Sequence, residues 1–473
     1  MNRIRISRPA PTTVERPRAR AARWTTAAAV AAALTLLVGP GQAHADIRCG
    51  TALQSNVCLE ANPTCPGAPA PLGPNPGSWP GFQRDLQHTG SSPVAGPTCG
   101  KILWTTKLDG KILAAPTLVQ GTAGDVESLY VPVGKVPICA LTPSDGSVQW
   151  CGTNDAGKSV DRSAPAVGNG HLLYVGTRDN DLWAVDLPAA DPDQKGPQGT
   201  VAWRQKVCTD GDVTTPPVIG KDGIIYMGSD SLGAGTLMAM CPGDQRHLKW
   251  CINPIGGGIR NASPALSPTG DRLYVTIGAS ALGAFDPETG AELWRVRLEP
   301  PGSAGRAPNY APVVNPVTGD IYLGTKRGIW EIQRQTDPQS GKETGVARLL
   351  FDTRPSRHRV FTPPALDVAH ATLVFGASQG NDSTLYAIGL DGTLKWQHAG
   401  LTGRFRNNPA VIDKDGRVYV AFARTVYAFN PSGPLLWFVE SKTGFSSSPI
   451  LAAGRLFVGR TNGNMMAIGD CAS

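Results

Sequence analysis

The feature that most constrains this chain is a pattern of about eleven residues that recurs along most of its length. Residues 284–294 read A-F-D-P-E-T-G-A-E-L-W, and residues 140–150 repeat the same spacing as A-L-T-P-S-D-G-S-V-Q-W. Copies that are one residue longer or shorter occupy 239–250, 387–396 and 428–437. A repeat with a period in the forties is typical of a chain built from similar supersecondary units, each of which buries its apolar face against the next.

Two further columns of residues, together with the alanine that opens the pattern, define eight such units. A proline opens each unit: Pro116, Pro165, Pro217, Pro264, Pro312, Pro364, Pro409 and Pro449. An aromatic residue follows: Tyr130, Tyr174, Tyr226, Tyr274, Tyr322, Phe375, Tyr419 and Phe457. An alanine comes next, at Ala140, Ala184, Ala239, Ala284, Ala387, Ala428 and Ala467, with Glu331 in its place in the fifth unit. Short β-branched and aromatic runs separated by Gly, Asp and Asn predict strands, and no helical pattern of 10–15 residues lies between them. We therefore expect an all-β fold, an eight-bladed β-propeller of four-stranded antiparallel blades.

The two ends of the chain predict how the ring closes. If the proline, aromatic, alanine and tryptophan columns mark the first to fourth strands of a blade, the eighth unit ends shortly after Ala467 without its fourth strand. The segment Lys101–Leu108, which contains Trp104, precedes the first proline and has no unit of its own. We expect this N-terminal strand to pair with the C-terminal blade, which leaves no open edge in the ring. Each tryptophan ring should pack between blades, with its indole N–H available to a backbone carbonyl.

The first 45 residues have the pattern of a signal peptide. Seven arginines precede the apolar run Ala27–Val38, which is too short to span a bilayer, and Ala43-His44-Ala45 supplies a cleavage pattern. The residues before Cys49 do not fit a lipidated cysteine. We expect a secreted or periplasmic protein without an integral membrane segment after cleavage, with a Pro/Gly/Cys-rich leader over 46–100 and the propeller over 101–473.

Removing the signal peptide also removes most of the net charge. It holds seven of the 44 Lys and Arg and one of the 37 Asp and Glu, so 37 basic and 36 acidic residues remain. A chain so close to neutral gives no case for nucleic-acid binding.

Ten cysteines in an exported chain predict disulfides. Cys99 and Cys471 fall where a blade's third and fourth strands meet, so their bond would clamp the ring closure. Cys139 and Cys151 flank the Asp145 turn almost symmetrically, which predicts a cross-strand pair.

The remaining cysteines are less constrained. Cys241 and Cys251 flank the next such turn and are expected to pair, although Cys208 competes for either. Three cysteines of the leader cannot be assigned: Cys49, Cys58 and Cys65.

Three motifs together resemble the PQQ-like, quinoprotein-type propeller repeat family. They are W-P-G-F-Q-R-D-L-Q-H-T-G-S-S-P at 79–93, the Ala-x-Asp-x-x-x-Gly-x-x-x-Trp docking motif, and the S/A-P-x-x-x-x-G-x-x-Y-x-G strands. The resemblance covers about Trp79 to Asp470 and implies eight blades. The family includes quinone-dependent alcohol dehydrogenases and non-enzymatic scaffolds, among them the propeller subunit of the bacterial outer-membrane assembly machinery, so it does not fix the function.

The enzymes of that family usually hold their quinone under a disulfide of two adjacent cysteines, with a catalytic Asp and a Ca²⁺ bound by Glu and Asn. This chain has no Cys-Cys pair and no CxxCH motif for a c-type haem. Candidate carboxylates lie in turns, where Asp is common for backbone reasons: Asp179, Asp181, Asp230 and Asp382. We assign no catalytic or metal-binding residue and expect no cofactor, with PQQ and Ca²⁺ as the alternative.

Positively charged side chains recur in the loops on one predicted face of the ring, where fourth strands connect to first strands and second to third. The candidates for ligand binding are Arg260, Arg306, Lys326, Arg327, Arg404, Arg406, Arg424 and Arg460, with Arg354, Arg357 and Arg359 beside them. Arginine binds carboxylates through two parallel hydrogen bonds, so such a face suits a protein or anionic polymer partner. The other interpretation is that these are solvated loop residues. We predict a non-catalytic binding or assembly scaffold; the alternative is a PQQ-dependent, alcohol-dehydrogenase-like oxidoreductase.

Overall fold

The computed structural model divides the chain into residues 1–48 and 49–473, and the described residues all belong to the second part. It describes residues 57–58, 65, 77–119, 127–134, 136–152, 160, 163–168, 172–177, 181–187, 199–206, 215–229, 235–243, 248–253, 255–259, 262–278, 281–299, 310–405 and 408–471. The signal peptide predicted over 1–45 lies outside them. Within the described residues, no helix is long and apolar enough to cross a membrane.

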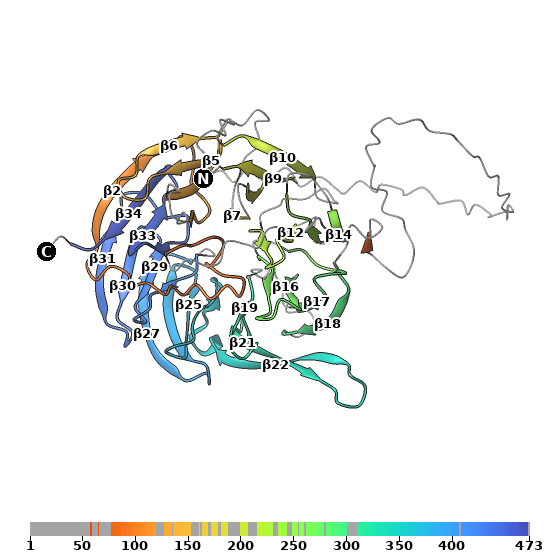
Figure 1. Cartoon of the computed structure of the whole chain (residues 1–473). Coiled ribbons are helices and arrows are strands. Elements are labelled where there is room, and N and C mark those ends of the chain that lie inside the picture. Colours follow the sequence, from red (N-terminus) through yellow and green to blue (C-terminus); the bar gives the residue numbers. More distant parts are fainter. Residues whose placement is uncertain are drawn as a thin grey trace, which may run out of the picture. The chain divides into compact units, whose positions relative to one another are not determined.

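Eight antiparallel sheets form an eight-bladed β-propeller, arranged around a central axis (Figure 1). Each blade has four strands, A to D, from the axis outward. The A strands are β3 (Thr117–Val119), β7 (Ala166–Val167), β11 (Val218–Ile219), β15 (Ala265–Leu266), β19 (Val313–Val314), β24 (Ala365–Asp367), β28 (Val411–Ile412) and β32 (Ile450–Ala452). The B strands are β4 (Ser128–Val133), β8 (Leu172–Gly176), β12 (Ile225–Ser229), β16 (Leu273–Ile277), β20 (Ile321–Gly324), β25 (Thr372–Gln379), β29 (Val418–Phe422) and β33 (Arg455–Gly459).

The two outer columns of strands complete the blades. The C strands are β5 (Val136–Leu141), β9 (Asp181–Asp186), β13 (Thr236–Met240), β17 (Ala281–Phe285), β21 (Gly328–Thr336), β26 (Asp382–Gly389), β30 (Thr425–Phe429) and β34 (Asn464–Gly469). The D strands are β6 (Val148–Cys151), β10 (Val201–Lys206), β14 (Leu248–Ile252), β18 (Glu292–Arg297), β22 (Glu343–Asp352), β27 (Leu394–Thr402), β31 (Leu435–Glu440) and β2 (Lys101–Lys107). Three further elements are β1 (Val57–Cys58), β23 (Arg359–Val360) and the 3₁₀ turn η1 (Arg354–Ser356).

The ring closes as predicted, because β2 is the outermost strand of the eighth blade. It pairs antiparallel with β34, and Trp104 lies opposite Ala467. The first strand of the propeller and the last thus share one sheet, and β34 is hydrogen-bonded on both edges, to β2 and to β33.

The repeating alanine and tryptophan are cross-strand partners. Ala284 lies opposite Trp294, and the corresponding pairs of the other regular blades have the same register. These alanines are fully buried.

The aromatic residue lies in the B strand of every blade, as predicted, but its register differs by one residue in the sixth. There Val374, not Phe375, lies opposite Ala387, while Phe375 lies opposite Tyr386 and stacks on it with ring centroids 5.3 Å apart. Successive residues of a strand face opposite sides of the sheet, so this one-residue shift places Phe375 on the side facing the fifth blade.

Of the docking tryptophans that the structure describes, six pack on a glycine of the next blade, and five donate their indole N–H to a carbonyl there. The Trp150 indole N–H has no acceptor among the described residues. A Cβ on Gly290, which has φ +73°, would lie 2.8 Å from the ring of Trp250, so only glycine fits. The donor and acceptor pairs are Trp104 to Pro143 (3.0 Å), Trp203 to Gly243 (3.1 Å), Trp250 to Pro287 (2.9 Å), Trp396 to Pro431 (2.9 Å) and Trp437 to Pro97 (3.0 Å). The turn of the repeat is therefore the socket for the preceding blade's tryptophan.

The fifth blade departs from the repeat through a long hairpin of β21 and β22, whose outer half is exposed (Figure 1). Its Glu343 still reaches the neighbouring blade, since the carboxylate accepts hydrogen bonds from the Trp294 indole (2.6 Å) and from Arg272 (2.8 Å). A side chain thus replaces the carbonyl that accepts the indole N–H elsewhere.

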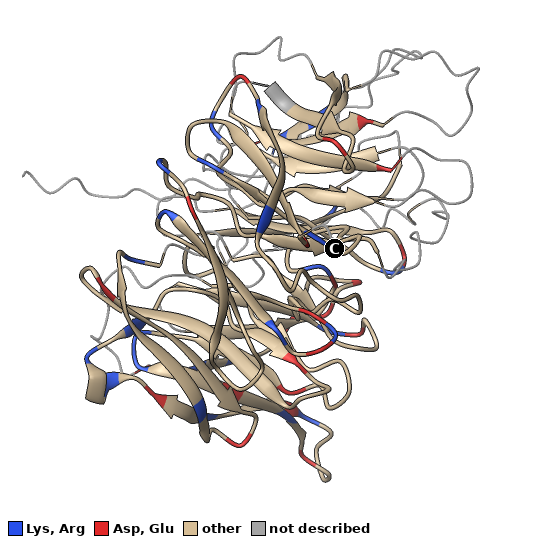
Figure 2. Ribbon diagram, turned by 90° about the vertical axis from the view of Figure 1, so that its left-hand side faces the viewer, with Lys and Arg blue, Asp and Glu red and all other residues tan. Residues whose placement is uncertain are grey.

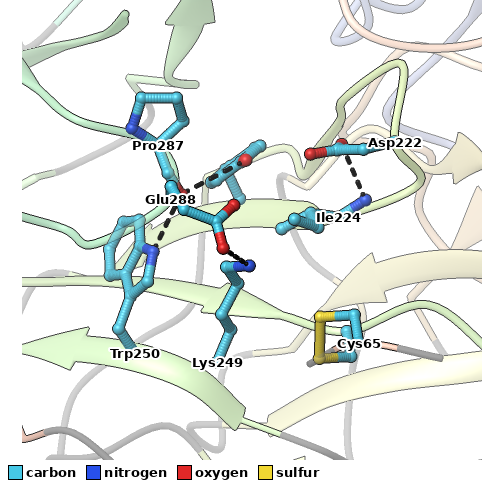
Figure 3. Close-up of a disulfide and its surroundings, with 9 residues drawn as sticks. Cys65, Asp222, Ile224, Lys249, Trp250, Pro287 and Glu288 are labelled. Atoms are coloured by element: carbon cyan, nitrogen blue, oxygen red, sulfur yellow. Dashed lines mark hydrogen bonds and ion pairs between the residues drawn. A yellow bond between two sulfur atoms is a disulfide. The ribbon is translucent and has the colours of Figure 1, made fainter. Parts of the chain in front are cut away.

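Two of the three predicted disulfides are present, and one pairing is wrong. Cys99 is bonded to Cys471 at the ring closure, and Cys139 to Cys151 across the β5–β6 hairpin. Cys241, however, is bonded to Cys65 of the leader, beside the contact of Trp250 with the fourth blade (Figure 3).

The reason for that error lies in the leader. Strand β1 adds to the outer edge of the third blade, antiparallel to β14, with Cys58 in register with Cys251. Cys251 is itself disulfide-bonded. The leader therefore reaches the third blade, and Cys65 meets Cys241 across 176 residues of sequence. Cys49 and Cys208 lie outside the described residues.

Candidate functional site

The chain's own segment Trp79–Pro97, which we call the axial plug, runs along the inner A strands that surround the propeller axis and then turns outward to Pro97 (Figure 1). Its backbone follows the A strands in blade order and hydrogen-bonds six of them. The bonded pairs are Trp79 with Leu118 of the first blade, Pro80 with Val167 of the second, Leu86 with Leu266 of the fourth, Gln87 with Val314 of the fifth, Thr89 with Leu366 of the sixth, and Gly90 and Ser92 with Ile412 of the seventh. The Ser92 hydroxyl donates to Leu451 of the eighth blade (3.2 Å). The plug thereby pairs some of the N–H and C=O groups that the inner strand edges would otherwise leave unpaired.

A compact loop at residues 83–90 gives the plug its shape. The Asp85 carboxylate accepts hydrogen bonds from the Thr89 backbone N–H (2.8 Å) and hydroxyl, and Gly90 N–H donates to the Gln83 carbonyl (3.0 Å). Gln83, Arg84 and His88 have φ of +46°, +79° and +58°, a conformation that non-glycine residues adopt only where their surroundings determine it.

Side chains of the same loop hold the blades together. Gln83 Nε2 donates to the Pro364 carbonyl (3.0 Å), and His88 Nδ1 lies 3.2 Å from the Pro312 carbonyl. Gln87 Nε2 reaches two carbonyls of the fourth blade, at 3.2 Å each. His88 is fully buried, and burial lowers its pKa to about 4. The motif at 79–93 therefore has a structural role that the sequence analysis missed, although two glutamines and a histidine within six residues are more polar groups than a plain linker needs.

The predicted cationic face consists of the D–A and B–C loops. Seen from the edge of the ring, basic residues are more frequent toward the left side and acidic residues toward the right, with both kinds on each side (Figure 2). Of the eight candidate residues, Arg260, Arg306 and Arg406 lie outside the described part of the chain. The other five lie in loops of the fifth to eighth blades.

Three of these five are engaged within the protein. The guanidinium carbon of Arg404 lies 4.2 Å from the centroid of the Phe361 ring, a cation–π contact. The backbone N–H of Arg327 donates to the buried Glu299 carboxylate (3.2 Å). Lys326 also interacts with another residue. The Arg404 charge reaches Tyr310 as well: burial raises the pKa of the Tyr310 phenol, and Arg404 opposes that rise.

The loop of Arg354, Arg357 and Arg359 is partly neutralised. Arg354 binds Asp352 through two hydrogen bonds, with Nε 2.9 Å and Nη2 2.5 Å from the carboxylate, and this contact lowers the pKa of Asp352. Arg357 and Arg359 are exposed on either side of the buried His358.

The last two candidates, Arg424 and Arg460, meet at one serine. Arg460 Nη1 donates to the Ser441 hydroxyl (2.8 Å), and the Ser441 backbone N–H donates to the Arg424 carbonyl (2.8 Å). The sequence predicted both residues for the same face, and the fold places their turns next to one Ser441 loop.

No group of three His, Cys, Asp or Glu side chains among the described residues is placed to hold a metal ion. Of the carboxylates considered from sequence, Asp382 lies 3.3 Å from His358 Nε2, Asp181 is buried in β9, and Asp179 and Asp230 lie outside the described part. The sequence also has no pair of adjacent cysteines, which the quinone enzymes of the family usually use to cover the cofactor. We derive no step through a quinone.

Comparison with known proteins agrees with this architecture. The family model described as "Outer membrane protein assembly factor BamB" matches residues 94–191, 189–381 and 381–470. The chain belongs to this family of PQQ-like β-propellers. No curated protein matches the sequence.

Solved structures share the fold at low identity. The quinohemoprotein alcohol dehydrogenase from Comamonas testosteroni superposes with a TM-score of 0.63 at 15% identity, over 84% of this chain and 81% of that one. BamB from Moraxella catarrhalis gives 0.54 at 15% identity, over 78% and 100%. Saccharomyces cerevisiae Sqt1 gives 0.57 at 12% identity, over 78% and 99%. An enzyme and other propellers thus share the fold, which alone does not decide between them.

Proposed function

We propose that the protein is an exported binding or assembly scaffold that holds a protein partner on its D–A and B–C loop face. The observation that carries this proposal is the axial plug. Because backbone and side chains of residues 79–97 bond the inner strands of seven blades, the axis serves to hold the ring together. We therefore infer that a partner binds to the outer surfaces of the propeller.

Two further observations support the proposal. Disulfides join Cys65 to Cys241, Cys99 to Cys471 and Cys139 to Cys151, as suits an oxidising compartment outside the cytoplasm. The loop face carries arginines whose charge would attract an acidic surface. BamB, which the family model names, is an outer-membrane assembly factor, so a partner in the cell envelope is a natural first candidate.

Cross-linking of the mature protein in an extract of its own envelope tests the scaffold. We expect a discrete cross-linked protein partner that is lost when Arg404, Arg424 and Arg460 are all replaced by Gln. A matched control removes three positive charges from the opposite face: Lys221→Gln, Lys342→Gln and Lys414→Gln. Equal capture by both triple variants would refute the loop face as the contact surface, and recovery of an anionic polymer in place of a protein would refute the partner class.

A separate measurement tests the enzyme alternative. The mature protein is titrated with PQQ and Ca²⁺ while the quinone absorbance is followed, and dye-linked alcohol oxidation is then assayed. We expect no saturable spectral change and no turnover above that of the heat-treated protein. Saturable turnover would overturn the proposal of a non-catalytic scaffold.

A further inference from the structure

Four loops meet where the seventh, eighth and first blades adjoin on the D–A and B–C face. Residues 423–424 form the B–C turn of the seventh blade, 441–449 lead into the eighth, 460–463 form its B–C turn, and 108–116 lead into the first. Backbone hydrogen bonds connect these loops. Phe445 N–H donates to the Ala423 carbonyl (2.8 Å), Thr461 N–H to the Gly444 carbonyl (3.1 Å), and Leu108 N–H to the Gly463 carbonyl (2.8 Å). We call this place the Arg460 junction.

The Arg460 guanidinium is incompletely satisfied there. Nη1 donates to the Ser441 hydroxyl (2.8 Å), whereas the buried Nε has no acceptor among the described residues. The buried Thr443 hydroxyl, two residues from Ser441, also has no partner there. Burial lowers the pKa of Arg460, and among the described residues no acidic group opposes that effect. A partly desolvated cation without a counter-ion is costly unless a ligand compensates it.

The charges around the junction are unbalanced. Its four loops contain Lys111, Arg424, Lys442 and Arg460 as cations and Asp109 as an acid, and the flanking strand ends add Lys107 and Glu440. Both Arg424 and Lys442 are exposed. Among the described residues, no acidic or aromatic partner is seen for the side chains of Arg424 and Arg460, whereas the Arg404 guanidinium packs on the Phe361 ring. The contact of Arg327 with the Glu299 carboxylate is made by its backbone N–H.

We propose that the Arg460 junction binds a carboxylate, through Arg460 and the Thr443 hydroxyl, with Arg424 and Lys442 adding long-range attraction. The assignment rests on the proposed scaffold function, in which the carboxylate is an acidic side chain of the partner protein. A carboxylate has two oxygens, so one can accept from the guanidinium while the other accepts from the hydroxyl. A free small carboxylate offers the same chemistry.

Thermal unfolding of the mature protein at constant ionic strength tests the site with succinate, phosphate or chloride as the varied anion. Succinate should raise the Tm saturably, because a ligand that binds the folded state stabilises it. Chloride should not. The dissociation constant should rise about tenfold or more in Arg460→Gln and by a smaller factor in Thr443→Val, since a charge-assisted hydrogen bond is stronger than a neutral one. Lys342→Gln, which removes one charge at the tip of the β21–β22 hairpin, should behave as wild type.

Two further measurements distinguish a carboxylate of a protein segment from a free small carboxylate. Calorimetric titration with a tetraglutamate peptide should give tighter binding than succinate if the site serves acidic protein segments, and equal or weaker binding refutes that source. Arg460→Lys keeps the charge and the fold but loses the planar fork, so an intermediate affinity supports the geometry. An unchanged succinate response in Arg460→Gln, or stabilisation by phosphate but not by succinate, overturns the proposal. Neither result depends on the envelope cross-link, so failure of this site and failure of the scaffold function can be told apart.

Discussion

Protonation of His88 should destabilise the propeller in mild acid. The imidazole lies in the axial plug with no exposed surface, its Nδ1 faces the Pro312 carbonyl, and its Nε2 has no partner among the described residues. Burial lowers its pKa from 6.5 to about 4, because the charged form loses its hydration. The perturbation that isolates this effect is His88→Gln, which retains an N–H donor for the carbonyl and cannot titrate.

The sign and size follow from proton linkage. Between the two pKa values the unfolded chain binds a proton that the folded chain does not, so stability falls as the pH drops through this window. A difference of about 2.5 pKa units corresponds to roughly 3 kcal/mol once the pH is below the folded value, and to about 2.5 kcal/mol at pH 4.5. The neighbouring Asp85, whose pKa burial raises, acts in the opposite direction, and it is present in both proteins.

Denaturant unfolding of the wild type and His88→Gln at pH 7.5 and pH 4.5 measures the effect. The wild type should lose about 2.5 kcal/mol more than the variant over that interval, whatever their difference at pH 7.5. His398→Gln, at a half-buried histidine of the outer strand β27, serves as the control and should follow the wild type. The same pH dependence in wild type and His88→Gln would refute the buried, neutral imidazole.

Three other substitutions test how the ring is held. Trp294→Ala should cost about 3–5 kcal/mol in denaturant unfolding, since the ring is 7% exposed and its indole is bonded; a loss below about 1 kcal/mol would contradict its burial. Gly290→Ala should also destabilise, by more than about 1 kcal/mol, because the left-handed backbone and the 2.8 Å approach to Trp250 both oppose a Cβ, and equal midpoints would disprove that socket. Replacing Cys99 and Cys471 by Ser should lower the unfolding free energy by about 3–5 kcal/mol, because the bond closes a loop spanning 372 residues, and wild-type stability in the double variant would show that the clamp contributes nothing.

The blade order could be predicted because its signals are local and repeated. The Ala column and the tryptophan ten residues later lie on adjacent strands of one hairpin, so Ala284 and Trp294 face each other wherever the turn forms. The missing strand of the last unit then identified β2 by elimination. Phe375 shows the limit: an aromatic in the expected segment can lie on either face, and neighbouring rings, not spacing, decide which.

The contacts of the leader could not be predicted in this way, because they join residues far apart in the sequence and do not recur from blade to blade. Cys65 and Cys241 are 176 residues apart, and a nearby cysteine at 251 offered a shorter loop that any spacing rule would choose. The Gln83–Pro364 hydrogen bond joins residues 281 positions apart. Nothing in the local pattern of the plug shows that six inner strands surround it.

The cationic face divides in the same way. The loops that carry Arg327, Arg404, Arg424 and Arg460 follow from strand order, so the sequence was enough to place these residues on one face. Which of these side chains already contact another group depended on the packing of neighbouring blades, for example the contact of the Arg404 guanidinium with the Phe361 ring.

The sequence by itself determined the number of blades, their phase and the strand that closes the ring. Strand pairing within a blade is local, and the same residue pattern specifies it in each copy of the repeat. Only the tertiary structure decided the path of the leader, the pairing of Cys241, and which of the described arginines contact an acidic or aromatic side chain. Those outcomes depend on groups far apart in the chain that meet only after the ring has formed.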